Sequence, residues 1–190
     1  MIDRRSTIEE LGRVTAEDHL LAPKLPVRVV LDDVRSRHNV GSVFRSADAF
    51  GIEGIILGGF TPLPPHREIE KTALGATRSV PWEHAPDVVS SIRSLKAAGY
   101  TVWAVEQTVN AIPLDALRHP LPERLAIVLG NELNGVSDPV IAECDACVVI
   151  PQRGSKHSLN VSVCAGIVLW ACCGSVTCAS GPRIDLSAHR

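Results

Sequence analysis

The segment Ile150-Pro-Gln-Arg-Gly-Ser-Lys-His-Ser-Leu-Asn-Val-Ser-Val163 joins the last predicted strand to the last predicted helix. Its polar middle contains a glycine, and the apolar run after it is typical of a buried helix. A helix that begins near Ser-Leu-Asn points unpaired backbone N–H groups toward the loop, where an anionic or strongly hydrogen-bonding ligand can bind. Taken by itself, this pattern favours an ordinary helix cap beside surface charge.

Apolar runs alternate with helical patterns along the whole chain. The patterns predict strands at 27–31, 55–57, 79–83, 101–105, 125–129 and 148–150, and helices at 39–50, 69–74, 87–98, 138–143 and 161–173. This alternation predicts an α/β fold, with about six strands in a mostly parallel sheet flanked by helices. The core should be aliphatic, because 45% of the residues are hydrophobic but only 4% are aromatic.

The length of 190 residues predicts one domain. We expect a short N-terminal extension over 1–24, the α/β domain over 25–175 and a C-terminal tail over 176–190, with both tails loosely ordered. No apolar run approaches the roughly 18 residues that span a bilayer. The N-terminus lacks the apolar segment of a secretory signal, so we expect no membrane partner and a cytoplasmic protein.

The six cysteines include the pair Cys144-x-x-Cys147, whose spacing is found in zinc and redox sites. No second pair follows at zinc-ribbon spacing, and no histidine pair completes a set of four ligands. Reduced, buried cysteines therefore account better for the pattern, and no metal is expected. A metal or redox protein built on Cys144 and Cys147 remains a lesser alternative.

The formal net charge is −2, so the chain as a whole is not a polycation, and a nucleic-acid partner would need a local basic surface. Three groups of basic residues could form one: Arg35, Arg37, His38 and Arg45; Arg67, Lys71 and Arg78; and Arg153, Lys156 and His157. Each group by itself is also expected as scattered, solvated charge.

Three polar loops, 32–39, 130–137 and 151–158, each follow a predicted strand. In open α/β sheets, ligands bind beyond the carboxyl ends of the strands, so these loops predict a site at one end of the molecule. The first motif is the segment Arg37-His-Asn-Val-Gly-Ser-Val-Phe-Arg-Ser-Ala-Asp-Ala-Phe-Gly51, in which Asn39 lies at the mouth of a helix and Arg45 lies further along it. An arginine offers a bidentate fork to phosphate. The alternative is a helix cap and an arginine that is paired with Asp48.

The second motif, Leu129-Gly-Asn-Glu-Leu-Asn-Gly-Val-Ser137, combines a strand end, two glycines, two amides and Glu132. Such a loop can surround a polar small molecule with backbone groups, and an ordinary tight turn is an equal alternative. No G-x-G-x-x-G follows the first strand, and no P-loop lysine is present. This argues against a dinucleotide enzyme and against a nucleotide hydrolase.

Three segments, in this order and spacing, resemble the signature motifs of the SpoU (TrmH-like) RNA ribose 2′-O-methyltransferases, which belong to the SPOUT superfamily. The segments are Asn-x-Gly-x-x-x-Arg, Gly-Asn-Glu…Gly-Val-Ser and Ile-Pro…Gly…Ser-Leu-Asn-Val-Ser. The resemblance covers about residues 27–173. It implies a C-terminal trefoil knot, an exception to the rule that chains do not thread loops. It also implies S-adenosylmethionine as cofactor, an obligate homodimer and an RNA substrate, with tRNA expected before rRNA because the chain is compact.

Carried onto this sequence, the resemblance implies cofactor contacts at Gly130, Ile150 and Leu159. The implied catalytic residues are Arg45, Asn39, Glu132, Ser158 and Asn160. In the family the arginine is proposed to act as a base after it engages an RNA phosphate; an arginine pKa above about 12 leaves the role of phosphate clamp equally open. We expect RNA contacts from Arg35, Arg37, Arg67, Arg78 and Arg153.

One position departs from the family pattern, because Gln152 follows Ile-Pro where methionine is common. The neighbouring contacts are made by backbone groups, so we expect cofactor binding to survive this change. A catalytically silent, knotted module that binds RNA or the cofactor is the main alternative to an enzyme. The five polar motif positions all carry the expected residue types, which favours the enzyme.

Overall fold

The structure, a computed structural model, describes residues 15–117, 120–156 and 158–173, together with Arg4, Thr7 and Gly12. In this part of the chain, seven strands form one sheet in the order β3-β2-β1-β6-β4-β7-β5, and every paired strand is parallel. The strands are β1 (Leu25–Asp32), β2 (Ile52–Gly58), β3 (Trp82–Ala85), β4 (Thr101–Val105), β5 (Ile112–Pro113), β6 (Leu125–Leu129) and β7 (Ala146–Val149). The predicted α/β class is confirmed, with one more strand than expected.

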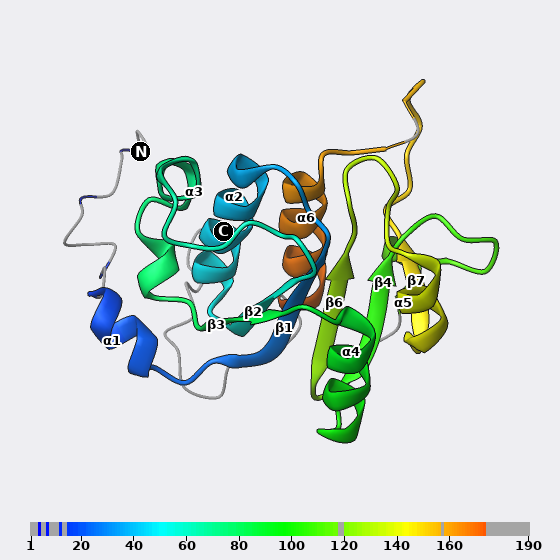
Figure 1. Cartoon of the computed structure of the whole chain (residues 1–190), viewed down its shortest axis with the longest axis horizontal. Helices are drawn as coiled ribbons and strands as arrows, with labels where there is room; N and C mark the ends of the chain where they lie inside the picture. The colour runs from blue at the N-terminus through cyan, green and yellow to red at the C-terminus, as the bar shows by residue number, and fades with distance from the viewer. Residues whose placement is uncertain are drawn as a thin grey trace.

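Helices cover both faces of the sheet (Figure 1). On one face lie α2 (Arg37–Phe50), α3 (Arg67–Ala73) and α6 (Val161–Cys173), and on the other lie α4 (Val88–Ala97) and α5 (Asp138–Glu143). The remaining elements are α1 (Ala16–Leu21) and the short 3₁₀ turns η1 (Ala76–Arg78) and η2 (Leu114–Ala116). No helix of the described residues is long and apolar enough to cross a membrane.

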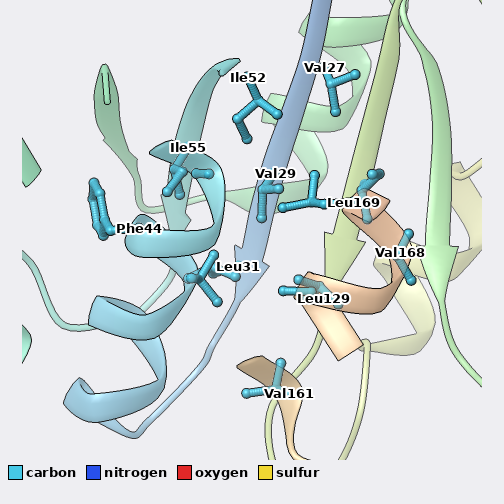
Figure 2. Close-up of a cluster of buried hydrophobic side chains, with 14 of the residues drawn as sticks. Val27, Val29, Leu31, Phe44, Ile52, Ile55, Leu129, Val161, Val168 and Leu169 are labelled. Atoms are coloured by element: carbon cyan, nitrogen blue, oxygen red, sulfur yellow. The ribbon is translucent and has the colours of Figure 1, made fainter. Parts of the chain in front are cut away.

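The larger part of the core lies between the sheet and α2, α3 and α6 (Figure 2). Val29 and Leu31 of β1 and Leu129 of β6 pack there with Phe44 of α2 and Leu169 of α6, and all five are at most 1% exposed. A parallel sheet covered on both faces needs strands that are apolar at nearly every position. This need explains the continuous aliphatic runs that predict β1, β4 and β6.

The segment after β7 contains the third motif, the stretch Ile150–Val163 quoted above. β7 pairs with β4, whereas α6 packs against α2 and belongs to the core over β1 and β6. The chain therefore returns across the molecule between β7 and α6, which is the orange segment at the top of Figure 1. The fold is that of the knotted SPOUT proteins, as the structural neighbours of the chain show.

Several element boundaries differ from the prediction. The cap of α2 is Ser36, whose Oγ accepts the Asn39 N–H at 3.3 Å, so Asn39 lies inside the helix and is not its cap. The third strand begins at Trp82 rather than Ser79, because residues 76–79 are taken up by η1 and its closing turn. α1 lies within the expected N-terminal extension, and residues 174–190 lie outside the described part.

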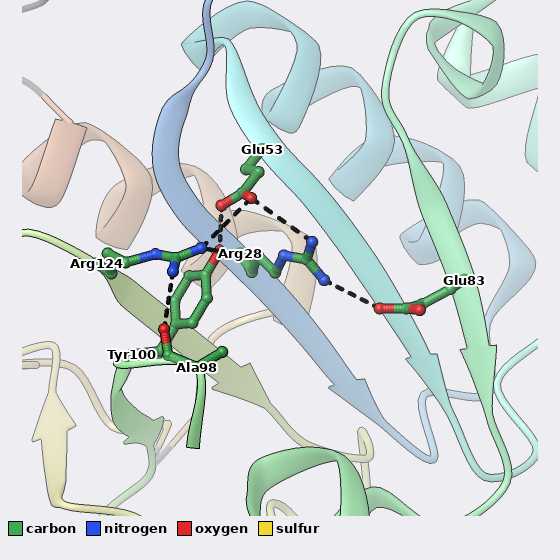
Figure 3. A network of polar contacts seen from close by, with 6 residues as sticks. All are labelled: Arg28, Glu53, Glu83, Ala98, Tyr100 and Arg124. Atoms are coloured by element: carbon green, nitrogen blue, oxygen red, sulfur yellow. Dashed lines mark hydrogen bonds and ion pairs between the residues drawn. The ribbon is translucent and has the colours of Figure 1, made fainter. Parts of the chain in front are cut away.

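A polar network ties the amino-terminal halves of the strands together (Figure 3). Arg28 of β1 pairs with Glu83 of β3 at 3.0 Å and with Glu53 of β2 at 3.6 Å. Tyr100 donates its hydroxyl hydrogen to Glu53, and the Arg124 guanidinium lies 4.2 Å from the centre of the Tyr100 ring. Burial, followed by the bond to Glu53, raises the pKa of Tyr100. These contacts fasten the sheet at the end opposite to the polar loops.

Candidate active site

A pocket of about 530 Å³ opens beyond the carboxyl ends of β4, β6 and β7. It is lined by the ends of these strands, by the loop after β6 and by the segment that leads into α6; the polar and loop residues include Glu106, Gly130, Asn131, Glu132, Asn134, Gly135, Ile150, Gln152, Ser158, Leu159 and Asn160. Its volume lies in the range of about 300–1,000 Å³ that is usual for small-molecule sites. The structure thus brings the second and third motifs to one pocket.

The loop after β6 is held in a tight turn. Asn131 and Gly135 exchange two backbone hydrogen bonds of 2.9 Å, and Gly135 has a φ of 70°. A Cβ at Gly130 would collide with the backbone of Gly135 and Val136, so only glycine fits where the turn closes. This requirement explains both glycines of the second motif and leaves backbone groups on the pocket wall.

Two acceptors on the β1 side anchor the same loop. The Asp32 carboxylate, at the end of β1 and 3% exposed, accepts the Ser137 N–H and hydroxyl, both at 2.9 Å. The Asn131 amide donates to the Asp33 carbonyl at 2.7 Å. The Ser137 side chain is therefore bonded to Asp32, although Ser137 precedes α5 as its N-cap residue.

Glu132 joins the second motif to the first. Its carboxylate accepts the backbone N–H groups of Arg35 and Ser36 and the side-chain amide of Asn39, all at 2.9 Å. Partial burial by itself would raise the Glu132 pKa, but the three donors outweigh burial, and the pKa falls below its ordinary value. Glu132 is thus held as a carboxylate whose oxygens are already engaged.

Asn39 carries the connection on to the third motif. Its side-chain oxygen accepts the Asn160 amide at 3.0 Å, while its own amide donates to Glu132. The Asn160 oxygen accepts the Ser162 N–H at 2.9 Å and so satisfies a free donor at the start of α6. Asn39 is 9% exposed, and buried polar groups of this kind specify a structure when every partner is present. Glu132, Asn39 and Asn160 therefore form one chain of hydrogen bonds across all three motifs, called here the motif chain.

The described lining of the pocket is negatively charged, although the third motif contains a group of basic residues. Glu106 and Glu132 are its charged lining residues, and no lysine or arginine lines it among the residues that the structure describes. Arg153 and Lys156 are exposed and are not part of the lining, and His157 lies outside the described residues. The pocket therefore suits a ligand that carries positive charge.

Arg45 lies apart from this pocket. It is exposed on α2 and lines a separate hollow of about 500 Å³ with Phe50 and with Lys71 and Thr72 of α3. The alternative pairing with Asp48 does not form, since Asp48 accepts the Ser79 hydroxyl and lies 3.5 Å from His19. One chain therefore does not bring Arg45 to the pocket that holds Ser158 and Asn160.

The five arginines expected to contact RNA are all exposed. Arg35 and Arg37 lie just before and at the start of α2, Arg67 begins α3, Arg78 ends η1, and Arg153 lies in the segment before α6. Arg37 lies 3.6 Å from Glu68, at the surface, where an ion pair is weak and does not prevent contact with phosphate.

Of the six cysteines, Cys172 and Cys173 are buried, Cys144, Cys147 and Cys164 are partly buried, and Cys178 lies outside the described residues. The Cys144 thiol donates to the Val140 carbonyl at 3.2 Å, and burial, then the neighbouring Cys147 and Asp145, raises its pKa to about 12. Burial also raises the pKa of Cys172 to about 11. Within the described residues, no group of three or more His, Cys, Asp or Glu side chains could hold a metal ion.

Sequence reasoning missed Glu106, which lines the pocket at the carboxyl end of β4. Its carboxylate accepts the Val136 N–H at 2.9 Å and the Gln107 N–H at 2.8 Å. An acidic residue directly after the apolar run 101–105 was the available signal, because ligands in such sheets bind beyond strand ends.

The chain is similar to known proteins over most of its length. The chain matches the SpoU rRNA Methylase family over residues 26–170. It is 34% identical to the 23S rRNA (guanosine-2′-O-)-methyltransferase RlmB of Vibrio parahaemolyticus over 170 residues, which are 90% of this chain and 68% of that protein.

Two solved structures are similar over most of the chain. The AdoMet-bound rRNA methyltransferase from Sinorhizobium meliloti has a TM-score of 0.73 and 29% identity, over 81% of this chain and 61% of that one. The A. aeolicus TrmH/SpoU tRNA modifying enzyme has a TM-score of 0.73 and 26% identity, over 83% of this chain and 79% of that one. This chain thus spans between 61% and 79% of the lengths of the three proteins.

Proposed function

We propose that this chain, which belongs to the SpoU family of RNA 2′-O-methyltransferases, uses S-adenosylmethionine (AdoMet) to methylate a ribose 2′-hydroxyl of a folded RNA. The observation that carries the proposal is the motif chain, in which Glu132, Asn39 and Asn160 are joined at 2.9 and 3.0 Å beside one pocket. A hydrogen-bond chain that joins three motifs far apart in sequence, beside one pocket, supports a single shared site.

The residues of the pocket fit AdoMet. The cofactor carries two positive groups, a sulfonium and an ammonium, and one negative carboxylate. The described lining of the pocket offers two carboxylates and no basic side chain. Gly130, Ile150 and Leu159 would hold it, largely through backbone groups that the tight turn leaves on the wall. Gln152 also lines the pocket, where the family pattern has methionine. When bound, AdoMet supplies an electrophilic methyl group.

The residues of the motif chain position groups for the reaction. The Glu132 carboxylate already accepts three N–H groups and has a lowered pKa, so it is a poor proton acceptor near neutral pH and serves to orient Asn39. Asn160 and the exposed Ser158 lie on the pocket wall, where an amide and a hydroxyl can orient a ribose. Their contribution is proximity and orientation.

A homodimer would complete the site. Val163, Ile167 and Trp170 are 49%, 36% and 71% exposed, and their spacing places them on one side of α6. The Trp170 ring also meets Phe50 of α2 edge-on, with 6.4 Å between ring centres, so this apolar surface continues toward α2 and Arg45. A second copy is the occupant we propose, because a two-fold contact would bury this face.

Such a dimer gives Arg45 a role that one chain cannot. Arg45 makes no ion pair with the described residues and does not line the pocket proposed for AdoMet in its own chain. Across the two-fold interface, the partner subunit's Arg45 would clamp an RNA phosphate beside the ribose. A clamp is preferred to a base, because an arginine side chain stays protonated in proteins. Mixed mutant dimers test whether the Arg45 of one protomer serves the site of the other.

The class of RNA is tested directly. The sequence favours tRNA, whereas the relatives described above are by name enzymes of 23S rRNA and of tRNA, so both RNAs are candidate substrates. Purified protein is incubated with methyl-labelled AdoMet and either 23S rRNA or total tRNA, with Asn160→Ala as the control. Transfer of label to one of them supports the proposal. If the cofactor binds and neither RNA is labelled, a catalytically silent binding module is favoured.

A further inference from the structure

Glu106 is one of the two carboxylates in the described lining of the pocket, and the proposed chemistry assigns it no specific contact. It follows β4, is partly buried and lines the pocket, and β4 pairs directly with β6, whose end carries Gly130. It therefore stands one strand away from the glycine turn. The motif chain does not include it, and it accepts its hydrogen bonds from a different part of the loop after β6.

The carboxylate is fixed in place but not saturated. One oxygen accepts the Gln107 N–H at 2.8 Å, and the other accepts the Val136 N–H at 2.9 Å. Each carboxylate oxygen can accept a second hydrogen bond. A Cβ at Gly135 would collide with Glu106, so the glycine leaves room for this side chain. Glu132 differs, because three N–H groups already occupy its oxygens.

Glu106 also acts electrostatically toward α6. Burial raises the pKa of the Cys164 thiol, and the negative charge of Glu106 raises it further. Cys164 lines the same pocket from the first turns of α6.

We propose that Glu106 recognises the ribose of the cofactor by accepting hydrogen bonds from its vicinal hydroxyls. The inference rests on the proposed function, because it requires an adenosyl cofactor in this pocket. An acidic residue near the carboxyl end of a strand, beside a glycine turn, is well placed to accept hydrogen bonds from a nucleoside ribose. A carboxylate with one spare lone pair on each oxygen matches a diol that has two donors.

The test is a calorimetric titration of the full chain and of its Glu106→Gln variant. The probes are S-adenosylhomocysteine and its analogue that lacks both ribose hydroxyls. The variant keeps one acceptor oxygen for the loop but loses the charge. We expect it to bind S-adenosylhomocysteine about tenfold or more weakly, since hydrogen bonds to charged groups contribute about 1.5–3 kcal/mol. For the analogue without hydroxyls, we expect wild type and variant to differ by less than about twofold.

Asp32→Asn is the matched control, because Asp32 also anchors this loop through a carboxylate but does not line the pocket. It should weaken both probes by the same factor. Equal losses for both probes in Glu106→Gln would make Glu106 a support of the loop and would overturn the inference. AdoMet is titrated as a further ligand; a loss for AdoMet without a loss for S-adenosylhomocysteine would assign Glu106 to the sulfonium and would also overturn the inference. If wild type binds neither cofactor, the proposed function fails instead.

Discussion

The Asn160 side-chain amide donates to the Asn39 oxygen at 3.0 Å, across 121 residues of sequence. Asn39 in turn donates to Glu132 at 2.9 Å. The start of α6, the interior of α2 and the loop after β6 are therefore fixed relative to each other by side chains rather than by backbone pairing. Such a site forms only when the last segment of the chain has crossed the sheet and α6 has packed.

Replacing the central member of the motif chain should cost both stability and order at the site. Asn39→Ala leaves the Asn160 amide without its acceptor and removes one donor from Glu132. We expect the free energy of unfolding to fall by about 1 kcal/mol, as for an ordinary hydrogen bond, because the partners left behind, Asn160 and Glu132, are exposed and can bond water. Urea denaturation measures this change. The control is Asn134→Ala, which removes an exposed amide from the loop after β6 that also carries Glu132. Equal stability of the two variants would contradict the account.

The contribution of Glu132 to the free energy of unfolding should depend on pH. Its pKa is lowered in the folded protein, so the stabilisation is fully present above the ordinary pKa of about 4.5 and is lost as the pH falls through the lower folded value. Glu132→Gln cannot accept all three N–H groups and should be less stable than wild type at pH 7. The difference should shrink below about pH 4.5. Urea titrations between pH 7 and pH 3 test this, and a constant difference would rule out the carboxylate as its source.

The fold was predictable where burial dictates composition. The runs 101–105, 125–129 and 161–173 were predicted with the boundaries that the structure has, because a covered parallel sheet and a buried helix need continuous apolar residues. β5 was missed because two residues, one of them Pro113, carry no periodic signal. Asn39 was taken for a helix cap because Ser36 and Asn39 are both good capping residues and only the backbone distinguishes them.

Arg45→Ala should separate methyl transfer from cofactor binding. Arg45 lies outside the pocket proposed for AdoMet, so the dissociation constant of AdoMet should change by less than about twofold, while transfer to RNA is abolished. Arg93→Ala is the matched control, because Arg93 is an exposed arginine paired with Glu143 on the opposite face of the sheet. Near-normal transfer by Arg45→Ala would show that the assignment of this residue is wrong.

Charge on the exposed side of α6 should prevent dimerisation. Trp170 is 71% exposed, and Trp170→Glu would place a carboxylate in the proposed interface. Light scattering after size exclusion should report a dimer for wild type and a monomer for this variant. Val109→Glu, at a residue 102% exposed in the loop after β4, should remain dimeric. A monomeric wild type, or a dimeric Trp170→Glu, would remove the basis for sharing Arg45.

Mixed dimers test that sharing more specifically. Arg45→Ala and Asn160→Ala chains are each expected to be inactive alone. Mixed together, they should regain activity, because one of the two sites then combines an intact Asn160 with the partner subunit's intact Arg45. The statistical yield is about a quarter of wild-type activity when chains exchange freely. Absence of recovery, with heterodimers verified by mass spectrometry, would mean that each site uses its own arginine.

The site was less predictable than the fold, for a physical reason. Polar residue types in the three loops indicated where a ligand binds, but not which atoms meet. That Glu132 accepts the backbone N–H groups of Arg35 and Ser36 depends on the packing of β1 beside β6. For Arg45, the spacing of the first motif does not indicate that the residue lies away from the pocket of its own chain. Glu106 could have been found from its place directly after an apolar strand.

The position of the transferred methyl group tests the central claim most directly. RNA labelled by the protein with methyl-labelled AdoMet is hydrolysed in alkali, which needs a free 2′-hydroxyl to cleave the chain. We predict that the label is recovered in alkali-resistant dinucleotides, each carrying a 2′-O-methylribose. Label recovered in mononucleotides would place the methyl group on a base and would contradict a ribose methyltransferase.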